Sequence, residues 1–125
     1  MSERSGHRSE HGSGTLLVAG AMLLLMVVAG VAMVLVGYIE AQHAAGGAAD
    51  LSALSGAAAY ARGDDACGTA REVARANGVA LTACTVSGDS FDFVVRVGVT
   101  KHLRAPPGLP GTVTAVAEAG RLTGG

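Results

Sequence analysis

One unbroken uncharged run, from Thr15 to Ile39, constrains this chain more than any other feature. An α-helix rises about 1.5 Å per residue, so a run of this length crosses a hydrocarbon core of roughly 30 Å with some length left for tilt. The run therefore predicts a transmembrane helix at 15–39. In a chain of 125 residues, this span leaves room for one small domain beyond the membrane.

A cleaved signal peptide and a buried helix of a soluble protein are the two alternatives to a retained span, and both are less favoured. A signal peptide has an apolar stretch of about 7–15 residues and a small-residue cleavage site of the A-x-A kind. This run is longer, and residues 40–44, EAQHA, offer no clear site of that kind. A buried soluble helix is disfavoured because the rest of the chain is too short to cover a helix that is apolar all round.

Basic residues beside the span indicate its orientation. Arg4 and Arg8 precede it, and the next Lys or Arg after it is Arg62, far from the membrane. Lys and Arg close to a span favour the cytoplasmic side, whereas acidic residues count for little. We therefore expect a single-pass cell-membrane protein with a cytoplasmic N-terminus and an extracytoplasmic C-terminal domain. The tail, residues 1–14, is rich in Gly, Ser and His and is expected to be disordered.

Composition and motifs exclude several classes of function. The formal net charge is −1, so no basic surface of the kind that binds nucleic acid is expected. Aromatic residues make up 3% of the chain and Trp is absent, which argues against base-stacking and sugar-binding sites. No GxSxG, P-loop, HExxH or CxxC motif occurs. We therefore expect no enzyme activity, no cofactor, no metal site and no small-molecule substrate, and we expect membrane lipid as a partner.

Isolated polar residues do not form a recognisable site. Asp64 and Asp65 are adjacent at the expected start of a helix, where carboxylates serve as caps rather than as a catalytic pair. His43 and His102 have no obvious partner in the sequence. The basic stretch at 101–104, KHLR, leaves two contacts open, a lipid headgroup or an acidic protein partner.

Cys67 and Cys84 are the two cysteines of the chain. Both fall on the side predicted to be exported, where disulfides persist, and small domains often need such a covalent link. A disulfide is therefore favoured over the alternative of two reduced, buried thiols. A zinc site is disfavoured because further ligands at close spacing are missing.

The segment directly after the span is expected to form a helical stalk at 40–63. It is dominated by Ala, the best helix former, and Gly63 is suited to end a helix. Leu51, Leu54 and Ala58 recur at helical spacing and predict an apolar stripe that packs on the head or on a neighbouring subunit. The pair at 46–47, Gly-Gly, is a possible hinge.

The head, residues 64–121, is predicted to have an α+β fold. A second short helix is expected at 66–77 and is ended by Gly78. Strands are expected at 79–86, 91–100 and 112–119, and they form a small antiparallel three-stranded sheet. The odd-numbered residues from Phe91 to Val99 are expected to lie on one face of the second strand. Residues 122–125 are expected to be frayed.

Small residues in the span predict a smooth surface for helix packing. Ala29, Gly30 and Gly37 let another helix approach closely, although no strict GxxxG motif is present.

The order of these segments resembles that of TadE-like proteins of actinobacteria. The resemblance rests on a polar tail, the span, AADLSALSGAAAYARG, ACGTAREVARANGVALTAC and the strand FDFVVRVGV, and it covers about residues 12–121. Members of this family are small pseudopilin-like components found with tight-adherence (Flp-type) pilus and secretion machinery. The resemblance implies a membrane-anchored, exported structural subunit of such a system, with pilin-like or secretion-platform proteins as partners. The alternative is a permanently anchored accessory subunit that does not enter a filament.

The family pattern also implies a prepilin-type cleavage after Gly12, which would make Ser13 the first residue. In TadE proteins proper, the fifth residue of the mature helix is Glu, whereas this chain has Leu17 there. Cleavage after Gly14 would place Ala19 at the fifth position, which does not restore the Glu. Pairing of that carboxylate with a neighbouring N-terminus therefore does not carry over to this chain.

Overall fold

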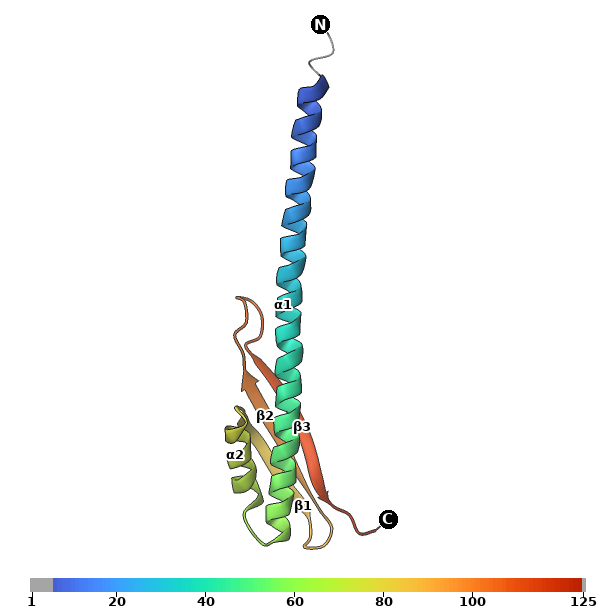
Figure 1. Cartoon of the computed structure of the whole chain (residues 1–125). Coiled ribbons are helices and arrows are strands. Elements are labelled where there is room, and N and C mark those ends of the chain that lie inside the picture. The colour runs from blue at the N-terminus through green and yellow to red at the C-terminus, as the bar shows by residue number, and fades with distance from the viewer. Residues whose placement is uncertain (1–5, 125) are drawn as a thin grey trace. The chain divides into compact units, whose positions relative to one another are not determined.

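A computed structural model describes residues 6–124 of the chain, and it describes side chains from Gly12 onward (Figure 1). The predicted α+β fold is confirmed, with a long apolar N-terminal helix, a second short helix and a three-stranded antiparallel sheet. The elements are α1 (Gly6–Ala61), α2 (Ala66–Ala76), β1 (Ala80–Gly88), β2 (Phe93–His102) and β3 (Thr112–Arg121). The chain divides into two units, one ending at Val36 and the other beginning at Gly37, and α1 contributes to both.

The first unit contains the apolar part of α1. This helix is the one element in the described part of the chain that is long and apolar enough to cross a membrane, which fits a single-pass membrane protein. Its large side chains are exposed, Leu16 at 75% and Met33 at 76%. Surfaces of this kind are stable in lipid rather than in water.

The helix begins earlier than the sequence predicts. Residues 6–14 belong to α1, although the tail at 1–14 was expected to be disordered, and residues 1–5 lie outside the described residues. Helix formation is cooperative, and adding residues to an existing helix is far easier than starting one. The apolar helix that follows supplies such a start, so a polar segment of weak propensity continues it.

The second unit contains the rest of α1, which runs through the Gly46–Gly47 pair as one uninterrupted helix. The predicted hinge is therefore absent. Ala45, Ala48 and Ala49 on either side of the pair are buried. Tertiary packing of this kind holds a helix straight despite the poor helix propensity of glycine.

The sheet has the order β1-β2-β3, with both neighbouring pairs antiparallel. In the central strand, Phe93, Val95, Val97 and Val99 are buried on one face, as predicted. Phe91 is an exception, because it lies before β2, in the turn after β1, and is 72% exposed. Figure 1 shows α2 lying beside the sheet at the β1 side, opposite the β3 edge.

A face of small residues on α1 forms the other side of the core. Ala45, Ala49 and Ala53 are fully buried, and they belong to one cluster with the valines of β2. Leu51 and Leu54 are 49% and 60% exposed, so the first of the two predicted contacts, packing on the head, is not made, and contact with a neighbouring subunit stays a prediction. The bulky side chains of β2 fill the space between the layers, so the helix face that meets them has to be small.

Gly56 marks the closest approach in this core. A Cβ atom at this position would lie 3.0 Å from the carbonyl oxygen of Ala66 and 3.3 Å from the Cγ1 atom of Val95. The start of α2 and the centre of β2 therefore both lie close against α1 at this point, and a side chain here would force the neighbouring atoms to move.

The disulfide between Cys67 and Cys84 is present, as predicted, and it joins α2 to β1. Asp65 caps α2 by accepting a hydrogen bond from the Gly68 amide at 3.1 Å. Gly63 and Gly78 follow the two helices with φ angles of +82° and +76°. These left-handed conformations suit glycine and end both helices where the sequence predicts.

We expect Gly56→Leu to destabilise the head strongly, because overpacking a filled core costs roughly 1–3 kcal/mol or more. Gly47→Ala is the matched control in the same helix, since a Cβ atom there meets nothing within 4 Å. The control should raise stability by up to about 1 kcal/mol. Urea unfolding of the full chain in detergent micelles, followed by circular dichroism, measures both changes. Equal stability of Gly56→Leu and the unmodified chain would contradict this packing.

Removal of the disulfide by the pair Cys67→Ser and Cys84→Ser should lower the free energy of unfolding by about 3 kcal/mol. The two residues are 17 apart in sequence, so the closed loop restricts the unfolded chain appreciably. The same denaturation experiment, repeated on the unmodified chain with and without reductant, provides the comparison. If the free energy of unfolding falls by well under 1 kcal/mol both in the double variant and in the reduced unmodified chain, packing alone holds α2 on the sheet.

Candidate interaction surface

The predicted helix-packing residues of the span are available for contact. Ala29 and Gly30 are exposed, and so is Gly37, the first residue of the second unit. A Cβ atom added at either glycine would meet nothing within 4 Å among the described residues. These positions therefore present a bare helix surface, as the sequence predicts.

The predicted stalk residues also face outward. Leu51, Leu54 and Ala58 are exposed, and together with the exposed Ala44 and Gly47 they recur at intervals of three and four residues. We call these five residues the outer stripe. The spacing is that of one seam along a helix, of the kind that packs against another helix.

If the apolar run of α1 crosses the membrane as far as Ile39, lipid acyl chains do not reach the leucines of the outer stripe. Leu51 follows Ile39, the last residue of the apolar run, by twelve residues, or about 18 Å along the helix. The headgroup layer adds only about 5–8 Å to each side of the hydrocarbon core. These two leucines are therefore left either to water or to another protein.

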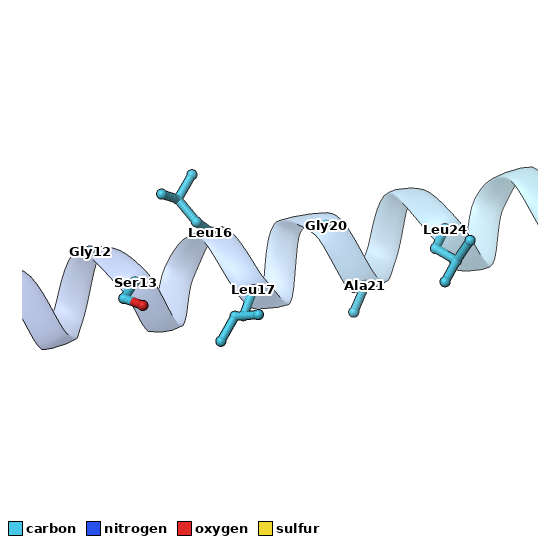
Figure 2. A pocket seen from close by; sticks show the side chains of 7 residues that line it. All are labelled: Gly12, Ser13, Leu16, Leu17, Gly20, Ala21 and Leu24. Carbon is cyan, nitrogen blue, oxygen red and sulfur yellow. The ribbon is translucent and has the colours of Figure 1, made fainter.

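A shallow groove lies along the first part of α1, and Figure 2 shows its seven lining residues. Leu16, Leu17 and Leu24 project from the helix, whereas Gly12 and Gly20 leave gaps between them. The predicted cleavage position, after Gly12, lies at one end of this groove. Gly12 and Ser13 are both exposed and both helical.

Two hydrogen bonds attach the β2–β3 hairpin to the beginning of the second unit. The Tyr38 hydroxyl donates to the carbonyl oxygen of Pro110, and Gln42 Nε2 donates to the carbonyl oxygen of Thr114 at 3.0 Å. Sequence reasoning missed both contacts. The one available signal was a polar patch of Tyr, Glu, Gln and His at residues 38–43, directly after the apolar run.

The opposite end of the sheet carries two organised carboxylates. Asp89 accepts hydrogen bonds from the backbone amides of Asp92 at 2.9 Å and Phe91 at 2.8 Å, and these bonds lower the pKa of Asp89. Asp92 accepts from the side chain and the amide of Thr123, which lower its pKa below the ordinary 3.8. The second contact holds the chain after β3 against the β1–β2 turn.

The remaining polar residues do not gather into a site. Asp65 is the cap of α2, and Asp64 pairs with Arg62 at 3.4 Å. Within the described part of the chain, no group of three His, Cys, Asp or Glu residues is arranged to hold a metal ion. His43 and His102 are both exposed, on α1 and at the end of β2.

The chain was compared with models of protein families, with characterised proteins and with solved structures, and none of the three comparisons gives a match.

Acidification should release the end of the chain from the turn. Because the folded-state pKa of Asp92 is lowered, its carboxylate stabilises the folded form at pH values above 3.8, and this contribution is lost as pH falls through the lowered pKa. NMR titration of the full chain in nanodiscs should show Thr123 shifting with a midpoint below 3.8. Asp92→Asn should abolish that titration. A midpoint at or above the ordinary value would contradict the contact.

Proposed function

We propose that this chain is a membrane-anchored structural subunit of the pseudopilin type, resembling TadE-like proteins, in a tight-adherence pilus or a related secretion system. In this proposal the N-terminal tail is cytoplasmic and the head is extracytoplasmic. The observation that carries it is the outer stripe, a seam of exposed apolar residues on α1 beyond the reach of lipid.

The span and the stripe together support assembly through helices. The exposed apolar surface of α1 within the membrane can exchange lipid neighbours for other helices at little cost, since lipid tails are as apolar as leucine. In the second unit, the outer stripe offers contacts to another helix over a segment that lipid does not cover. A subunit with both surfaces gains stability when it moves from the bilayer into a bundle of similar helices.

A second candidate is a permanently anchored accessory subunit that stabilises a larger envelope complex without entering a filament. The observation that favours it is Leu17, which stands where the family pattern has the Glu linked to processing and pairing. The outer stripe would then contact one fixed partner helix rather than successive copies of a subunit.

Intact mass and N-terminal sequencing of the protein from its native membrane, without reductant, separate the two candidates. A chain that starts at Ser13 would support the pseudopilin function. A chain that retains its tail would favour the accessory subunit. A chain that starts near Ala44 would mean a secreted protein, and it would overturn both proposals.

Replacing the two leucines of the outer stripe tests the assembly surface. We expect Leu51→Gln with Leu54→Gln to reduce co-purification with partner subunits by at least about tenfold, because each buried leucine contributes roughly 1.5–3 kcal/mol. Both side chains are exposed in the single chain, so the head should stay folded.

Val116→Gln is the matched control, because Val116 is a 60%-exposed apolar residue on β3 rather than on α1. It should leave co-purification unchanged. If the leucine pair and the control behave alike, the outer stripe is not the assembly surface.

A further inference from the structure

If α1 crosses the membrane as far as Ile39, the end of the β2–β3 hairpin lies near the depth of the lipid headgroups. Gln42 bonds to Thr114 at 3.0 Å, and Thr114 is the register partner of Thr100 in β2. Gln42 follows Ile39 by three residues, about 4.5 Å along the helix. The headgroup layer extends about 5–8 Å beyond the hydrocarbon core, so Thr100 and the residues after it lie within or beside that layer.

Basic side chains gather at this end of the second unit. Lys101 and His102 directly follow Thr100, and Arg104 comes shortly afterwards. Arg71 and Arg75 of α2 line a hollow of about 400 Å³ together with Thr100 and His102. The Lys101 ammonium lies 3.9 Å from where a Cβ atom of Gly78 would stand, so it lies beside the end of α2. We call Arg71, Arg75, Lys101, His102 and Arg104 the basic end.

Among the described residues no carboxylate forms an ion pair with the basic end, although Glu72 of α2 lies between Arg71 and Arg75 in sequence. The hollow has no Asp or Glu in its lining. In the described part of the chain, the two ion pairs are Arg62–Asp64 at 3.4 Å and Arg96–Glu118 at 3.3 Å, and neither uses a residue of the basic end. The organised carboxylates Asp89 and Asp92 lie at the β1–β2 turn, a full strand of β2 away.

The dipole of α2 explains only part of this arrangement. Cations near the C-terminus of a helix are stabilising, which accounts for Arg75 and the adjacent Lys101. Arg71 lies in the middle of α2 and His102 lies on β2, so neither is placed by that effect. Their convergence on one hollow at headgroup depth calls for an anion from outside the chain.

We propose that the basic end binds the phosphate groups of anionic lipids in the leaflet from which the head emerges. Arginine suits this task because its planar donors match phosphate oxygens, and the Thr100 hydroxyl adds a neutral donor in the same hollow. The anchor holds these basic side chains permanently beside the membrane surface, where lipid phosphate is abundant. The inference requires only membrane anchoring and holds for either candidate function.

The test uses the full chain in phosphatidylcholine vesicles with trace spin-labelled phosphatidylglycerol or phosphatidylcholine. The fraction of motionally restricted label gives the preference of the protein for the anionic lipid. We expect Arg71→Gln with Arg75→Gln to lower this preference about threefold or more at low salt, and added salt to weaken it in the unmodified chain. Lys101→Gln with Arg104→Gln leaves α2 untouched and should act in the same direction.

Arg62→Gln with Arg121→Gln is the matched control, because it removes the same charge from the opposite end of the unit, where Arg121 pairs in register with Phe93. Arg4 and Arg8 are unchanged in every variant. An intact disulfide, checked by mass, and an unchanged circular dichroism spectrum establish that each variant is folded. A preference that falls in both basic-end variants and persists in the control supports the proposal.

Three results would overturn it. The first is an anionic preference that is the same in the basic-end variants and the unmodified chain. The second is a fall of equal size in the control, which would mean net charge rather than a site. The third is binding of inorganic phosphate to the hollow, seen by NMR, without any lipid preference. If the basic-end variants lose an acidic protein that co-purifies with the unmodified chain but keep its lipid preference, the basic end binds a protein, and the proposal is overturned as in the first result.

Discussion

The contact between the small-residue face of α1 and the valines of β2 is the interaction on which the second unit depends. Ala45, Ala49 and Ala53 are fully buried there, and so are Val95 and Val97. A three-stranded sheet with one short helix has little apolar surface of its own, so it needs this third layer to form a core. The same helix carries the apolar span, so one element serves both as anchor and as part of the core.

This double use explains how side chains are distributed around α1. The face toward the sheet is small because β2 fills the space between the layers, and at Gly56 even a methyl group would be unusually tightly packed. The larger apolar residues, Leu51 and Leu54, are displaced to the outside. A helix that meets its own head through alanine therefore keeps leucine for contacts with other molecules.

Sequence reasoning predicted the elements well because their signals are local. The uncharged run, the alternation in β2, the glycines after both helices and the cysteine pair each depend on a few neighbouring residues. It left open whether the leucine stripe of α1 meets the head or another subunit, because that depends on how large the opposing side chains of β2 are. The Tyr38 and Gln42 contacts and the convergence of Arg71 with His102 join residues far apart in sequence, so no local pattern could reveal them.

The disulfide and the noncovalent contacts of the head join different parts of the chain. The disulfide joins α2 to β1, both of which come after α1, so it does not attach the sheet to the anchor. Apart from the backbone itself, that attachment is noncovalent and is made by α1 from Tyr38 to Tyr60. A soluble fragment started at Asp64, the apparent domain boundary, would keep its disulfide yet present Phe93, Val95, Val97 and Val99 to water. A soluble form of this domain therefore has to retain α1 from about Ala45 onward, where the core cluster begins, so that the helix remains one of its layers.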